Sequence, residues 1–143
     1  MAVTVSLYNH TARLLANGSS PAADTFRVML CTSATFAAAN TTLAGITKTE
    51  VATANGYTAG GVALANVTIS TVTTNDARFD ADDATWSATG SAITASYAIV
   101  YNDSDTDDPP LAFVDFGESR SASAGTDFKV VWSTNGIFEW IVA

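Results

Sequence analysis

The segment from residue 93 to residue 116 constrains the fold most strongly, because it contains two apolar runs joined by a polar loop. Ile93 to Tyr101 alternates larger residues with smaller ones, which would place its odd-numbered residues on one face of a strand. Leu111 to Phe116 is apolar on both faces apart from Asp115, which suits a central strand. The loop from Asn102 to Pro110 would join the two runs as an antiparallel hairpin. We therefore expect a β-sheet domain in which the other strands pack against this hairpin.

Further segments of the chain carry strand patterns bounded by turn residues. They span residues 24–31, 62–72, 77–79, 84–88, 126–132 and 137–142. In the first of them, Phe26, Val28 and Leu30 alternate with Arg27 and Met29. Residues 62–72 and 77–79 form one strand or two.

The dipeptide Asn135-Gly136 is a strong hairpin signal between the last two predicted strands. That hairpin would place Trp132 and Trp140 in the core on either side of the turn. Tyr8 to Ala16 predicts a short helix, with Asn9 as a cap and Gly18 as a stop.

Residues 32–54 have no regular pattern and predict a long ordered excursion with room for one helical turn. No internal repeat is visible, and 143 residues fit one domain spanning residues 1–143. The predicted fold class is all-β, an antiparallel β-sandwich or a jelly-roll-like barrel with a short N-terminal helix.

The composition is that of an ordered protein, with 48% hydrophobic and 14% charged residues. Much of the hydrophobic content is alanine, which buries little apolar area per side chain. We therefore expect part of the stability to come from neighbouring subunits, in a homo-oligomer.

The charge balance argues against two classes of partner. The formal net charge is −8, and the six basic residues are scattered along the sequence. Nucleic-acid affinity depends on Lys and Arg side chains that neutralise phosphates, so DNA and RNA are not expected partners. An anionic membrane surface would repel the chain, and no apolar run is long enough to span a membrane.

Two features concern export and the state of the cysteine. The N-terminal residues lack the apolar core and cleavage site of a signal peptide, so export by that route is not expected. The single cysteine, Cys31, ends an apolar strand pattern, where a buried and inert thiol is the usual outcome.

The loop 102–110 carries the one pattern that suggests a metal. Asp103, Asp105 and Asp107 alternate as calcium ligands do. An EF-hand would need Gly at the sixth position and Glu at the twelfth, where this chain has Asp108 and Val114. The three aspartates are therefore weak candidates, and a solvated hairpin loop is the alternative.

Three other groups of residues have the types found in catalytic or ligand-binding sites. Asp80, Asp82 and Asp83 include the paired carboxylates of a glycoside hydrolase, but a turn explains them more simply. His10 is the only histidine and is expected to cap a helix or lie on the surface. The glycines of residues 56–61 lack the Lys-Ser/Thr of a P-loop and predict turns. We therefore expect no enzyme, no cofactor and no small-molecule substrate.

Aromatic residues offer a platform for sugars, since aromatic faces stack well on apolar surfaces. Trp132 and Trp140 share faces with apolar neighbours, which leaves Trp86 as the best exposed candidate. A carbohydrate-binding receptor module built on Trp86 is therefore the alternative from another functional class.

Six segments in this order resemble a family of small virion structural proteins of tailed phages and prophages, often encoded beside capsid and head genes. They read DTFRVML, NGYTAGGVAL, FDADDATWSA, SYAIVYND, PLAFVDFG and WSTNGIF. The resemblance spans nearly the whole chain, and GYTAGG, FDADDATWSA and the PL-x-x-x-DFG segment are its most specific parts.

The resemblance implies a bacteriophage virion structural protein and assigns no functional residue. Within that class, an acidic β-domain suits a capsid decoration or cement protein that binds the major capsid protein and stabilises the head shell. It would be made in the host cytoplasm and lie on the outer surface of the head. A tail or neck component is the alternative within the virion.

Overall fold

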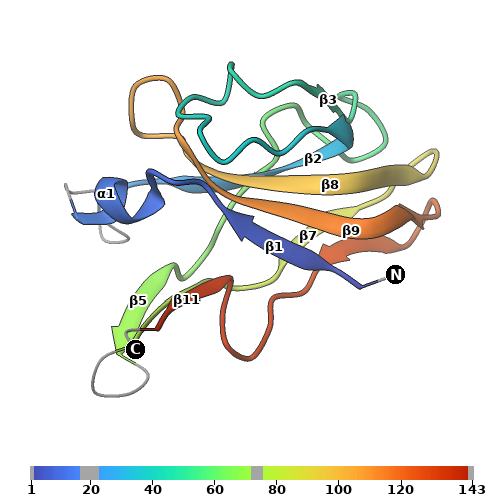
Figure 1. Ribbon diagram of the computed structural model, residues 1–143. Helices are drawn as coiled ribbons and strands as arrows, with labels where there is room; N and C mark the ends of the chain where they lie inside the picture. The colour runs from blue at the N-terminus through green and yellow to red at the C-terminus, as the bar shows by residue number, and fades with distance from the viewer. Residues whose placement is uncertain (1, 17–22, 72–75, 142–143) are drawn as a thin grey trace.

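The computed structural model describes residues 2–16, 23–71 and 76–141, which form an antiparallel β-protein with a short N-terminal helix (Figure 1). The predicted fold class is confirmed as a sandwich of sheets, and the described strands form no closed barrel. The elements in chain order are β1 Thr4–Leu7, α1 Thr11–Ala16, β2 Phe26–Ala34, β3 Lys48–Glu50, β4 Val62–Ala63, β5 Thr68–Thr71, β6 Ala77–Asp80, β7 Ala84–Ser87, β8 Ile93–Asn102, β9 Pro110–Ala122, β10 Asp127–Val130 and β11 Phe138–Trp140.

One large sheet, the main sheet, organises the molecule. Its strand order is β1-β9-β8-β2-β3, and the short β4 also pairs with β2. Two smaller sheets, β10-β7 and β11-β6-β5, face it on the side of the main core. Every strand pair in the three sheets is antiparallel.

The predicted hairpin is confirmed, because β8 and β9 pair along most of their length. Its expected face pattern is wrong, because the ladder is interrupted between Ala95 and Tyr97, where β9 holds several extra residues. This bulge changes which residues face the core, as bulges do. Ala95 before the bulge and Ala98 after it both lie in the main core, whereas Ile99 lies on the opposite face.

The main core lies between the main sheet and the two smaller sheets. Phe26, Val28 and Leu30 of β2 point into it, as the alternation predicted. Phe79 of β6 meets Phe26 edge to face with 5.3 Å between ring centroids, and stacks on Phe138 of β11 at 4.9 Å. These aromatic contacts join the sheet β11-β6-β5 to β2.

A second, smaller core covers the other face of the main sheet. The excursion predicted for residues 32–54 is shorter in the structure, because β2 extends to Ala34 and β3 forms at Lys48–Glu50. The connecting residues 35–47 are ordered, fold over this face and contain turns without a helical turn. The buried members of the second core are Tyr8, Met29, Cys31, Ile46, Ile99, Tyr101 and Phe113. β2, β8 and the first half of β9 therefore have buried side chains on both faces where the two cores cover them, which explains the apolar sequence of these stretches.

The predicted helix forms but begins at Thr11 rather than at Tyr8. The backbone N–H of Leu14 donates to the carbonyl of His10 at 2.9 Å, and the Thr11 hydroxyl donates to the carbonyl of Leu111 at 2.7 Å. The helix is thus anchored on β9. The expected stop at Gly18 lies outside the described residues, as do the expected strand ends at Val72 and Val142.

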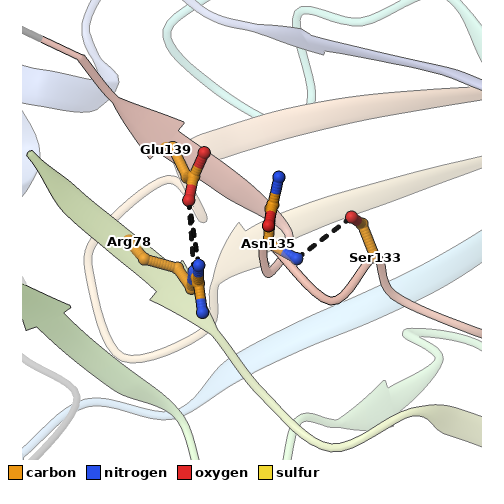
Figure 2. Close-up of polar contacts among 4 residues, drawn as sticks. All are labelled: Arg78, Ser133, Asn135 and Glu139. Atoms are coloured by element: carbon orange, nitrogen blue, oxygen red, sulfur yellow. Dashed lines mark hydrogen bonds and ion pairs between the residues drawn. The ribbon is translucent and has the colours of Figure 1, made fainter. Parts of the chain in front are cut away.

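The predicted hairpin around Asn135-Gly136 is wrong, although the turn itself forms. The N–H of Gly136 donates to the carbonyl of Ser133 at 2.8 Å, and the N–H of Asn135 donates to the Ser133 hydroxyl at 3.1 Å (Figure 2). The flanking strands then separate, because β10 pairs with β7 and β11 pairs with β6. The turn therefore passes the chain from one small sheet to the other.

Candidate binding surface

In the acidic loop between β8 and β9, aspartates bond to nearby backbone groups and are not brought together as the ligands of a metal ion would be. Asp105 accepts a 2.8 Å bond on its carboxylate from the N–H of Thr106 and a 3.2 Å bond on its carbonyl from the N–H of Asp108. Asp103, Asp105 and Asp107 are all exposed. Within the described ranges, no three His, Cys, Asp or Glu residues lie close enough together to hold a metal ion.

The second acidic group holds the connections around β6 and β7 together. Asp82 accepts a 2.7 Å bond from the side-chain amide of Asn66, and Asp83 accepts a 3.0 Å bond from the N–H of Trp132. Asp80 accepts a bond from the adjacent N–H of Ala81 at 2.9 Å. Asp80 therefore bonds locally, as a turn residue does, whereas Asp82 and Asp83 tie this segment to residues distant in sequence.

The expected surface position of His10 is wrong. His10 does precede α1 directly, and its backbone carbonyl accepts from the N–H of Leu14 as that of a helix cap does. Its side chain is buried, and its Nε2 lies 2.6 Å from the carbonyl oxygen of Pro110, at the start of β9. His10 therefore ties the N-terminal segment to β9, beside the bond made by Thr11.

The segment containing residues 56–61 consists of turns, and Gly56, Gly60 and Gly61 all have positive φ. A side chain at Gly61 would collide with the backbone, because its Cβ would lie 1.8 Å from the carbonyl oxygen of Val28. The turn can therefore lie directly on β2, which only glycine permits.

Trp86 was expected to be the best exposed aromatic platform, and the structure overturns this. Its side chain is only 5% exposed and packs near Phe128, with the ring centroids 6.3 Å apart. Trp132 and Trp140, which were predicted to be core residues, are half-buried against the main core. The even-numbered side chains of β7 face the main sheet. A strand of four residues is too short for its alternation to predict which face is buried.

Cys31 lies in the second core and is fully buried. Burial, with a smaller contribution from Glu50, raises the pKa of the Cys31 thiol to about 12. The thiol is therefore protonated at neutral pH, as expected of an inert structural cysteine.

Four of the six basic side chains make contacts within the chain. Arg27 and Lys48 donate to backbone carbonyls, and Arg78 and Arg120 form ion pairs with Glu139 and Glu118. Figure 2 shows the Arg78–Glu139 pair, 3.1 Å long, bridging β6 and β11. The basic groups are spread over the molecule and form no stripe for phosphates.

A candidate binding surface is an apolar groove of about 660 Å³ between β1 and β10, which we call the β1–β10 groove. β9 forms its floor, and the segment after β10 closes one side. Its apolar lining includes Val3, Val5, Val114, Phe116, Phe128 and Val131. Val3, Val5 and Val131 are among the most exposed large hydrophobic residues of the described chain.

Sequence reasoning missed this groove because it predicted no strand before residue 8. The alternation of Val3, Val5 and Leu7 with Thr4 and Ser6 was the available signal, since a period of two is typical of a strand. The position of the groove depends on β1 pairing with β9, which is more than a hundred residues away in sequence.

No protein-family model, curated protein or solved structure matches the chain. In the described part of the chain, none of the helices has the length and apolar character needed to cross a membrane.

Proposed function

We propose that this chain is a virion structural protein of a tailed phage or prophage, and specifically a decoration protein that cements the capsid. It binds the major capsid protein on the outer surface of the head and stabilises the shell. The order of the six sequence segments that resemble small virion structural proteins supports the class.

The observation that carries the head assignment is the distribution of charge. The net charge is −8, and most basic side chains are engaged by carbonyls or glutamates of the same chain. A protein that faced packaged DNA would need free basic groups to neutralise phosphates. An acidic surface is compatible with the outside of the shell, away from the genome.

The architecture supports a structural role. The strands β2, β8 and β9 contribute side chains to both cores, so the domain is built around one well-packed sheet. The β1–β10 groove offers apolar surface for a protein contact. The sugar-binding alternative has lost its best residue, because Trp86 is buried.

Copy number in purified particles tests the proposal. A cement protein repeats with the icosahedral lattice, whereas a neck or tail-tip protein is limited to a ring of low symmetry. We expect the band of this chain to be comparable in molar amount to the major capsid protein, and to stay with DNA-filled heads separated from tails. A band at a small fraction of the capsid protein that travels with tails would contradict the proposal and favour the tail alternative.

A second measurement tests the stabilising role directly. Heads that lack this protein should release DNA at a lower temperature than complete heads, and addition of the purified protein should restore the difference. Equal release temperatures with and without the protein would contradict a cement function even if the copy number were high.

A further inference from the structure

We propose that the free edge of β1 pairs antiparallel with β1 of a second copy, which forms a two-fold dimer and covers the β1–β10 groove of each copy. This association belongs to the purified chain itself and goes beyond the proposed function, because it requires no capsid.

The first argument is that, among the described residues, the smaller sheets that face the main sheet place no strand opposite β1. Val5 pairs in register with Val114, so its side chain lies on the same face as a main-core residue. Val5 is nevertheless 42% exposed. The facing sheet ends with β10, whose Phe128 packs against Phe116 of β9 with 6.1 Å between ring centroids. Apolar surface on the core side of β1 is therefore uncovered.

The second argument is that the outer edge of β1, a strand of four residues, lacks two of the usual protections against strand pairing, which are charged side chains and proline. β1 is the terminal strand of the main sheet (Figure 1). Its sequence, TVSL, contains no charge and no proline, and its register with β9 is continuous. The edge strands β3 and β10 each carry both an acid and a lysine. Charged side chains on edges prevent pairing with other chains, and β1 lacks them.

The third argument is electrostatic and favours a second copy at this edge. Two acidic segments, residues 76–83 and 103–108, hold four aspartates each and would repel a second acidic copy. The charged groups beside the β1–β10 groove are Asp127 and Lys129, together with Arg120 paired to Glu118 at 3.0 Å. Asp115 of β9 lies opposite Thr4 of β1 and adds one negative charge. These groups sum to −1 in a chain of net charge −8, so two copies meet less repulsion there than at the acidic segments.

The strand β5 is the best competing edge and serves as a control. It is also an uncharged terminal strand, and its Ile69 is 42% exposed, the same fraction as Val5. Thr68 of β5, however, lies opposite Asp80 in the acidic segment 76–83. Pairing of β5 with β5 of a second copy would bring together two segments that each hold four aspartates and only one arginine, Arg78. The register places a single aspartate, Asp115, opposite β1, so the acidic segments disfavour β5 more strongly.

A two-fold arrangement pairs the free β1 edges of both copies in a single contact. In an isologous interface each contact occurs twice and the assembly closes, so no fibre grows. Val3 and Val5 of each copy then lie on the same face of the joined sheet as the valines of the partner, and the two grooves become one shared apolar interior.

The test is the mass of the purified protein by light scattering over a range of concentrations. We expect a dimer for the wild-type chain. Val5→Lys should weaken the dimer at least about tenfold, because a charge would be buried twice in the interface. Ile69→Lys is the matched control and should leave the mass unchanged. A monomeric wild type, a trimer or higher assembly, or dissociation by Ile69→Lys instead of Val5→Lys would overturn the proposal.

Cysteine cross-linking provides a measurement that does not depend on destabilising the interface. A two-fold axis between antiparallel strands places the central residues of β1 next to their own equivalents. Under mild oxidation, at least one of Thr4→Cys, Val5→Cys and Ser6→Cys should form a covalent dimer, and Ile69→Cys should not. The buried native Cys31 does not interfere. Absence of cross-linking at all three β1 positions would overturn the proposal.

Discussion

The Tyr57 hydroxyl donates a 2.7 Å hydrogen bond to Oε1 of Glu50 and accepts a 3.0 Å bond from the backbone N–H of Leu30. Leu30 lies on β2 between the residues that pair with β3 and those that pair with β4. The tyrosine therefore completes the hydrogen bonding of β2 where no strand covers it. The same Glu50 oxygen accepts from the N–H of Gly60.

This arrangement predicts a difference between two buried tyrosines. Tyr57→Phe should lower the free energy of unfolding by about 1–3 kcal/mol, because it leaves the buried N–H of Leu30 without a partner. The Tyr8 hydroxyl is also buried but has no hydrogen-bond partner among the described residues. Tyr8→Phe should therefore leave the stability unchanged or raise it by about 1 kcal/mol. Urea unfolding of the two variants measures the contrast, and equal losses would contradict it.

A second prediction concerns two glycines with similar φ but different surroundings. Gly61 has φ +74° and lies against the backbone of Val28, whereas Gly125 has φ +84° with open space around the Cβ position. Gly125→Ala should cost about 1 kcal/mol from backbone strain alone. Gly61→Ala should cost several times more, because the methyl group would displace β2. Thermal midpoints of both variants check this, and similar shifts would show that the Val28 contact is unimportant.

The third prediction reverses the expectation that the sequence suggests for the tryptophans. Trp86→Ala should cost about 3–5 kcal/mol, the usual loss for a buried Trp. Trp132→Ala should cost less, because that ring is half-buried and loses mainly a 3.1 Å bond from its indole N–H to the carbonyl of Asp82. Chemical denaturation ranks the two variants. A larger loss for Trp132→Ala would mean that Trp86 is not a core residue.

The fourth prediction is loss of stability at alkaline pH. Burial raises the pKa of Cys31 from 9.0 to about 12, and it also raises the pKa values of Tyr8, Tyr57 and Tyr101. Above pH 9 the unfolded chain therefore loses protons that the folded chain retains. The free energy of unfolding should be unaffected by these groups below pH 9 and should fall as the pH rises, by up to about 1.4 kcal/mol per pH unit for each group.

Denaturation curves at a series of pH values measure this loss. Cys31→Ala is the control and should remove the part of the decrease that begins near pH 9, while the tyrosine part, which starts near pH 10, remains. In addition, native wild-type protein should not react with a thiol reagent at pH 8, whereas unfolded protein should react. A rapid reaction of the folded chain would contradict the burial of Cys31.

The sequence predicted the parts of the fold that depend on local pattern. The β8-β9 hairpin, the alternation in β2 and the position of the short helix agree with the structure, because each depends on periodicity or turn chemistry within one segment. The positive φ values of Gly56, Gly60 and Gly61 also follow from local turn signals.

Features that depend on distant partners could not be predicted in this way. The bulge at Ser96 exists because β9 carries extra residues opposite it, and no pattern within β8 shows them. The turn at Asn135-Gly136 forms, but β6 and β7 provide better partners for the strands beside it. His10 is buried because the carbonyl of Pro110 lies within hydrogen-bonding distance. The β1–β10 groove is missed for the same reason, since its walls come from opposite ends of the sequence.

The pairing of β1 with β9 also has a consequence for synthesis on the ribosome. His10 and Pro110 are separated by 100 residues, so β1 is made long before its partner exists. At a translation rate of about 5–20 residues per second, the interval is about 5–20 s. During that time both edges of the uncharged β1 are unpaired, and the nascent chain presents an apolar strand to chaperones and to neighbouring polysomes. Once β9 has been synthesised, it pairs with one edge of β1 and ends the exposure of that edge.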